Sequence, residues 1–161
     1  MVTAMSVTSL DFKQALGRFA SGVTVISVET EGVPVGMTAS AFLSVSLDPP
    51  LVLVSVAKKA QMHARLVAGA AWTASVLRAD QEKLSNLFAG YGQGEPEWID
   101  DTGGAPRLAG SLAWVACTPF AAHDAGDHTL FVGKVESSGI AEGAPLLYFT
   151  GKYRFLAPLP D

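Results

Sequence analysis

Cysteine and histidine are scarce in this chain, and runs of basic residues are short. Among its 161 residues there are one cysteine, Cys117, and three scattered histidines. These counts exclude an internal disulfide framework and a Cys-rich zinc site, and we expect no bound metal. Lys and Arg number 11 against 15 Asp and Glu, and the only basic run is Lys58-Lys59. We therefore expect no nucleic acid among the partners.

Long apolar runs are missing as well. No run approaches the ~20 residues that a membrane span requires, so no membrane is expected among the partners. Residues 1–9 carry no cationic patch ahead of an apolar stretch, so no secretory signal is expected. Apolar residues nevertheless make up 49% of the chain and charged residues 16%, which excludes an intrinsically disordered protein. We expect a soluble, cytoplasmic protein with one domain and one core.

Apolar residues at helical spacing predict three short helices. The first stripe repeats from Phe12 to Phe19 and is predicted to end at Gly22. A second helix is predicted over 62–67, and a third over 84–91 with Asp80 as its N-cap. Strands are predicted over eight segments: 23–29, 35–47, 51–57, 71–77, 111–117, 129–135, 146–150 and 153–156.

These strands do not alternate one-for-one with helices, which disfavours a doubly wound parallel sheet. Many strands at short spacing, separated by Gly and Pro, favour a mainly β fold: a small antiparallel β-barrel with short flanking helices. One polar stretch, 90–106, carries five glycines and two prolines. Its length suits a lid, a partner contact or a solvated excursion.

The segment 35–47 is the most informative part of the sequence. Its odd positions are all apolar, whereas its even positions are mostly glycine and hydroxyl residues. Because side chains alternate along a strand, the segment predicts one strand, or two around a bend, with one packed face and one narrow polar face without a charge. Such a face lets a flat ligand approach the backbone. A hydroxyl-rich contact between strands or between two copies explains the pattern equally well.

Three further features are candidates for ligand contact. Lys58-Lys59 stands between a predicted strand and a predicted helix, where cations and free N–H groups suit a phosphate, although a solvated pair is commoner. His128 stands at the start of a predicted strand. A histidine in such a place orients a ligand or relays a proton, or it is simply a surface residue. The segment 151–154 combines a turn glycine, two cations and an aromatic ring. It suits stacking and anion contact, or a surface hairpin.

Signatures of several other enzyme classes are absent. Gly90, Gly92 and Gly94 follow a predicted helix, whereas the dinucleotide-binding fingerprint follows a strand and opens a helix. The sequence holds no P-loop, no Gly-x-Ser-x-Gly elbow and no Cys/His pair at nucleophile spacing. Hydrolase chemistry therefore has no support in the sequence.

Several segments in order resemble the short-chain flavin reductases, the reductase components of two-component flavin-dependent monooxygenases. The matching stretches cover nearly the whole chain: RFASGVTV (18–25), GMTASAF (36–42), SVSLDPPL (44–51), GDHT (126–129), GKV (133–135) and PLLY (145–148). The resemblance implies an antiparallel flavin-binding split barrel. It implies one domain over residues 1–161, with its core at about 10–157.

The resemblance also implies site residues and cofactors. Non-covalent FMN or FAD is expected to contact Gly36, Met37, Thr38, Ala39 and Ser40, then Ser55, Val56, Ala57 and Lys58 toward its phosphate, with Phe88 closing the pocket. NADH or NADPH is expected over the flavin, near His128, Tyr153 and Arg154. Relatives often carry Ser or Thr where this chain has Lys58-Lys59-Ala60, so the phosphate contact here is expected to rest on lysines and backbone.

The function implied by the resemblance is that of an NAD(P)H:flavin oxidoreductase, which reduces FMN or FAD by hydride transfer and supplies reduced flavin to a partner monooxygenase. The implied assembly is a homodimer with the flavin near the interface. Two alternatives stay open: an oxidoreductase of this fold that acts on another small molecule, and a non-catalytic flavin- or haem-binding module. The sequence does not distinguish FMN from FAD as the flavin or NADH from NADPH as the hydride donor. It does not identify the monooxygenase that is served.

Overall fold

The computed structural model describes residues 6–157. These residues form twelve strands: β1 (Ser21–Gly22), β2 (Thr24–Thr30), β3 (Val33–Ala39), β4 (Phe42–Leu47), β5 (Pro50–Ala57), β6 (Trp72–Val76), β7 (Trp98–Ile99), β8 (Arg107–Leu108), β9 (Ala113–Ala125), β10 (His128–Ile140), β11 (Leu147–Phe149) and β12 (Lys152–Arg154). The helical elements are α1 (Ser9–Leu16), α2 (Gln61–Val67), the 3-10 turn η1 (Ala79–Gln81) and α3 (Glu82–Phe88). The expected mainly β class is confirmed.

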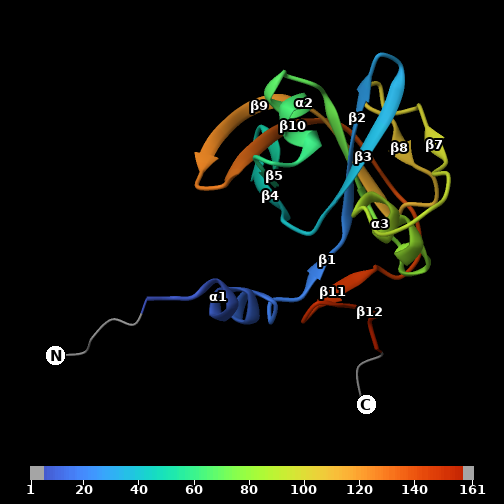
Figure 1. The fold of residues 1–161 in the computed structure, drawn as a ribbon. Coiled ribbons are helices and arrows are strands. Elements are labelled where there is room, and N and C mark those ends of the chain that lie inside the picture. Colours follow the sequence, from blue (N-terminus) through green and yellow to red (C-terminus); the bar gives the residue numbers. More distant parts are fainter. Residues whose placement is uncertain (1–5, 158–161) are drawn as a thin grey trace.

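Seven strands form one antiparallel sheet in the order β3-β2-β6-β9-β10-β5-β4. This sheet curls into the barrel in the upper part of Figure 1, and α2 packs against β3 and β5. Alternate residues of each strand fill the interior, as Val52, Val54 and Val56 of β5 do beside Trp72. The two edge strands, β3 and β4, are joined by a corner at residues 40–41.

The corner at 40–41 reverses the alternation predicted for 35–47. In β3 the odd positions pack against the core, namely Val35, Met37 and Ala39. After the corner the even-numbered Phe42 packs against the core instead, and three apolar side chains of β4 are exposed: Leu43, Val45 and Leu47. The prediction of one packed face along the whole segment is therefore wrong for β4, because the chain bends out of strand conformation at residues 40–41 and the alternation starts again with the other face inward.

A three-stranded antiparallel sheet, β1-β11-β12, lies below the barrel in Figure 1. It shares with α3 a second buried cluster, made of Val23, Val25, Leu77, Leu108 and Leu146. Two hydroxyl groups fix α3 in place. The Thr38 hydroxyl of β3 donates to the Ser85 carbonyl at 2.6 Å, and the Tyr153 hydroxyl of β12 lies 2.7 Å from the Ser85 hydroxyl.

Helix α1 begins with a capping box and projects from the barrel (Figure 1). The Asp11 N–H donates to the Thr8 hydroxyl, and the Asp11 carboxylate accepts from the Thr8 N–H. None of the residues of α1 is buried. The helix ends at Leu16, earlier than the predicted Gly22, because Ser21 and Gly22 pair with β11 instead.

The third helix is also shorter than predicted. Asp80 lies in η1 and does not cap α3, because its carboxylate accepts two hydrogen bonds from the Arg78 guanidinium at 2.9 Å each. The helix ends at Phe88, and Tyr91 beyond it is exposed. No helix within residues 6–157 is long and apolar enough to cross a membrane.

The second half of the polar stretch 90–106 is part of the packed structure and not a lid. It crosses the outer face of β2 and β6, where three fully buried hydroxyl residues meet it. Ser27 donates to the Pro106 carbonyl, Thr73 donates to the Ala105 carbonyl, and Ser75 accepts from the Leu108 N–H at 3.0 Å. These bonds hold the segment 102–108 against the barrel.

Candidate functional site

A cleft of about 780 Å³ lies beside β4, β5 and β10, where the chain enters β1. Its walls are mostly apolar, and hydroxyl groups stand among them. The lining residues are Phe19, Ser21, Gly22, Val23, Thr24, Ser40, Ala41, Phe42, Leu43, Leu53, Ser55, Val76 and Leu130. A cleft of this size suits a small organic ligand.

Strand pairing brings Ser55 and His128 to the cleft side of the sheet. Val54 and Val56 point into the core, so Ser55 between them faces outward. Ser55 is paired with Leu130, and His128 is paired with Ala57. Directly opposed residues share a face of the sheet, so His128 lies on the face of Ser55, two residues from Leu130.

The corner between β3 and β4 supplies a second hydroxyl. The Ser55 N–H donates to the Ala41 carbonyl and the Phe42 N–H to the Ser40 carbonyl, both at 3.0 Å. These bonds fix the corner against β5 and leave Ser40 exposed at the cleft. Neither hydroxyl, on Ser40 or on Ser55, bonds to another residue in the described part of the chain. Both are therefore available to a ligand.

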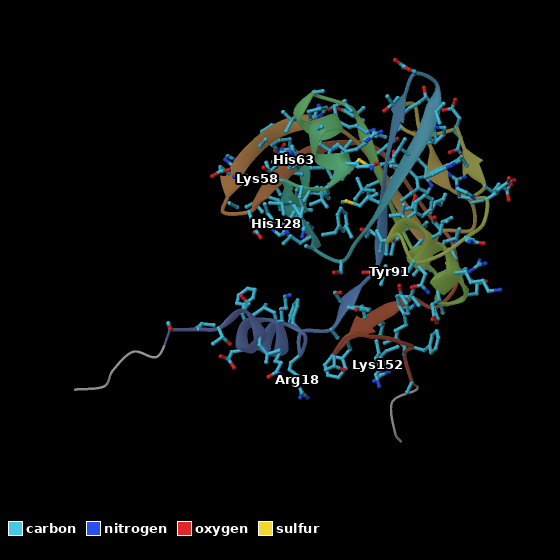
Figure 2. The ribbon with its side chains drawn as sticks, viewed as in Figure 1. Arg18, Lys58, His63, Tyr91, His128 and Lys152 are labelled. Atoms are coloured by element: carbon cyan, nitrogen blue, oxygen red, sulfur yellow. The ribbon has the colours of Figure 1, made fainter. Side chains whose placement is uncertain are left out.

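Charged groups gather at one end of the barrel, where β5 leads into α2 and β9 turns into β10. Figure 2 shows Lys58, His63 and His128 together there. The Lys58 ammonium is ion-paired with Asp124, and its backbone N–H donates to the Asp127 carbonyl at 2.9 Å. One lysine of the predicted Lys58-Lys59 phosphate contact is therefore already ion-paired with a carboxylate of β9.

Asp127 and His128 form a second polar pair in this region. The His128 Nδ1 lies 2.7 Å from an Asp127 carboxylate oxygen. This hydrogen bond, together with the charges of His128 and Lys59, holds the pKa of Asp127 below its ordinary value. A carboxylate at this position favours a proton on Nδ1, which leaves Nε2 as the atom that can contact a ligand.

Several residues predicted to contact flavin have side chains outside the cleft. Met37, Ala39 and Val56 belong to the barrel core, and Thr38 is bonded to α3. The Phe88 ring packs directly against Gly36, because a Cβ at residue 36 would lie 2.6 Å from that ring. Flavin contacts by these residues stay predictions. None of residues 36–39 and 56 is among the residues that line the cleft.

The C-terminal residues predicted at the nicotinamide lie in the lower sheet. Tyr153 packs against the second core cluster, and its hydroxyl donates to the Asn86 side chain at 3.1 Å. Arg154, next to it, is exposed. Their nicotinamide contacts stay predictions, and the packing of Tyr153 against α3 gives it a structural role in addition.

Sequence reasoning missed the apolar walls of the cleft. Leu53 and Leu130 alternate with core residues and so were indistinguishable from them by hydropathy. Leu43 faces the cleft because the corner at Ser40-Ala41 reverses the alternation, up to the register shift between Ser44 and Ser46. The bond of 2.8 Å between His63 and Thr129, which ties α2 to β10, has no sequence signature.

Comparison with known proteins identifies the family of this fold and cleft. Residues 16–157 match the family described as flavin reductase like domain. The chain belongs to this family. An NADH-dependent flavin reductase of Rhodococcus sp is 47% identical over 155 residues, covering 93% of this chain and 88% of that protein. A 4-hydroxyphenylacetate 3-monooxygenase reductase component of Thermus thermophilus is 44% identical over 146 residues, covering 90% and 95%.

Solved structures of flavin reductases share the fold. The flavin reductase PheA2 in its native state superposes with a TM-score of 0.91 at 42% identity, covering 94% of this chain and 100% of that one. The NADH:FAD oxidoreductase SgcE6 of Streptomyces globisporus, in complex with NAD and FAD fragments, superposes with a TM-score of 0.87 at 36% identity. The match covers 98% of this chain and 100% of that one. The predicted family and its split-barrel fold are confirmed.

Proposed function

We propose that the protein oxidises NADH or NADPH and reduces FMN or FAD, and that the reduced flavin serves a partner monooxygenase. The cleft carries this proposal, because it offers flat apolar walls and two free hydroxyls to a planar ring with polar edges. Flavin, when bound, supplies the hydride chemistry by accepting a hydride from the nicotinamide. The protein then has to bind and orient the two molecules.

Each part of the cleft has a definite task in this proposal. Leu43, Leu53 and Leu130 pack against the ring system and exclude water from it. The hydroxyls of Ser40 and Ser55 form hydrogen bonds with its polar edge. Lys58 and Lys59 attract the phosphate at the end where β5 meets α2.

His128 is proposed to position the nicotinamide. Hydride transfer moves no proton to the protein, so no general acid or base is needed for this step. With Nδ1 engaged by Asp127, the Nε2 of His128 is free to contact the carboxamide of the nicotinamide. Tyr153 and Arg154 are proposed to contact the same nucleotide from the lower sheet.

We also propose that two copies of the chain form a homodimer. Helix α1 carries a stripe of exposed apolar side chains, Phe12 and Leu16, and Phe19 is exposed just beyond the end of the helix. No residue of α1 is buried. The edge strand β4 exposes three more, Leu43, Val45 and Leu47, and Leu47 is 96% exposed. Exposed apolar surfaces of this kind mark interaction sites. Sedimentation of the wild type against Leu16→Asp tests the proposal. A monomeric wild type would refute it.

Residues 1–161 are proposed to form one domain, whose core spans about 10–157. We propose a cytoplasmic location, where nicotinamide nucleotides are available to such an enzyme. The thiol of Cys117 is free and buried, which agrees with a reducing compartment.

Oxidation of NADH and NADPH, followed at 340 nm with FMN, FAD or riboflavin added in turn, tests the proposed activity. We expect oxidation that depends on added flavin and saturates with it. Oxidation that requires a different small-molecule acceptor would replace this proposal with the second alternative. Absence of oxidation with every flavin would favour a non-catalytic module.

A further inference from the structure

A second hollow, of about 410 Å³, lies between the end of α1 and the turn that joins β11 to β12. We call it the basic hollow; its lining is Lys13, Gln14, Gly17, Arg18, Thr150 and Gly151. The two walls come from opposite ends of the sequence. The Thr150 N–H donates to the Gly17 carbonyl at 2.9 Å and fixes one wall against the other.

Two cationic residues line the basic hollow without anionic partners. Lys13 and Arg18 both belong to the wall at the end of α1, and Lys152 follows the lining residue Gly151 in the chain. Among residues 6–157, no carboxylate lies within 4.0 Å of these three groups. Asp11, the acidic residue of α1, caps the start of the helix. In a protein of net charge −4, this is a local excess of positive charge.

The basic hollow is separate from the cleft and from the apolar stripe of α1. Helical spacing puts Phe12 and Leu16 on one side of α1 and Gln14 on the opposite side, with Lys13 between the two sides. Figure 2 shows Arg18 and Lys152 below the barrel, on the side away from Lys58 and His128. A second copy that covers the apolar stripe would therefore leave the basic hollow open.

We propose that the basic hollow binds the phosphate or diphosphate group of a nucleotide. Lys13 and Arg18 attract a multiply charged anion from one wall, and the glycines at positions 17 and 151 let it approach the backbone. The volume exceeds that of a lone phosphate, so part of a nucleoside fits with it. The choice of a nucleotide rests on the proposed function, whereas anion binding does not.

The test compares the wild type with the double variant Lys13→Gln/Arg18→Gln, which removes both lining cations, by isothermal titration calorimetry. The probes are inorganic pyrophosphate and ADP. We expect the double variant to bind both at least about tenfold more weakly. Lys83→Gln, an exposed lysine on α3 outside the basic hollow, is the control and should bind as the wild type does. Added potassium chloride should weaken binding by the wild type more than by the double variant.

Two further measurements identify the source of the anion. Weaker FAD binding at constant FMN binding assigns the basic hollow to the adenylate of FAD, and a raised KM for NADH assigns it to NADH. Both support the proposal, as does a loss confined to pyrophosphate and ADP. Wild-type protein that binds neither probe, or a double variant that binds both equally well, overturns it. Because pyrophosphate binding needs no turnover, failure of the proposed activity would leave this test intact.

Discussion

Two outer faces of the barrel carry hydroxyl side chains, and the chain itself covers only one of them. On β2 and β6, Ser27, Thr73 and Ser75 are fully buried, because the segment 102–108 lies over them and bonds to them. At the cleft, Ser40 and Ser55 face open space and bond to no described residue. The same kind of side chain is structural on one face and available to a ligand on the other.

The difference shows what makes a hydroxyl functional in this fold. A buried hydroxyl without a partner is costly, so those on the covered face are all satisfied by backbone groups. The hydroxyls at the cleft can stay unpaired because water or a ligand reaches them. Substitutions on the covered face should therefore change stability, and substitutions at the cleft should change ligand binding.

The largest expected effect comes from filling the cleft. Ser40→Leu places a branched side chain where the ring of the flavin is proposed to lie, and should weaken FMN binding at least about 100-fold. Ser40 is exposed, so the free energy of unfolding should change little. Titration followed by flavin fluorescence measures the affinity. Ser138→Leu, at an exposed position of β10 outside the cleft, is the control. An unchanged FMN affinity in Ser40→Leu would place the ring elsewhere.

The opposite outcome is expected on the covered face. Thr73→Val keeps the shape of the side chain but removes the donor to the Ala105 carbonyl. We expect a loss of about 1–3 kcal/mol in the free energy of unfolding, with the FMN affinity unchanged. Urea unfolding of the wild type and the variant measures the loss. A variant that unfolds as the wild type does but binds FMN poorly would reverse the comparison between the two faces.

The sequence predicted the strands better than it predicted what covers them. The short apolar segments 51–57 and 71–77 located β5 and β6, because strand propensity is a local property. The stretch 90–106 looked like a loop from its glycines and prolines. Its role as a cover depends on bonds to Ser27 and Thr73, which lie far away in sequence. No local pattern encodes such a contact.

The candidate site was predicted in part for the same reason. Ser40 and Ser55 were named through motifs, and both line the cleft. Gly36 and Phe88 were named with them, yet these two residues pack against each other. A motif preserves residues that build the site together with residues that contact the ligand, and only the fold separates the two groups.

A third prediction concerns Cys117, a buried residue of the barrel core that is paired with Trp72. Burial, with a contribution from Glu136, raises the pKa of this thiol to about 12. The unfolded thiol ionises near pH 8.5, so above that pH the unfolded chain holds fewer protons than the folded one. Stability should therefore fall as pH rises, by up to about 1.4 kcal/mol per pH unit from this group. Urea unfolding between about pH 8 and about pH 10.5 should show a shallower fall in Cys117→Ala.

The smallest effect is expected at the charged end of the cleft, and it separates the phosphate from the ring. The Lys58 ammonium is half exposed and paired with Asp124, so each change there should shift affinity by about 1 kcal/mol or less. Lys58→Gln should weaken FMN binding a few-fold and leave riboflavin, which has no phosphate, unaffected. Asp124→Asn frees the ammonium and should tighten FMN binding by a similar factor. The ratio of FMN to riboflavin affinity, measured for both variants at low salt, gives the contribution of the phosphate alone. If the ratio stays at the wild-type value in both variants, the phosphate is held by backbone groups and Lys58 serves only its ion pair with β9.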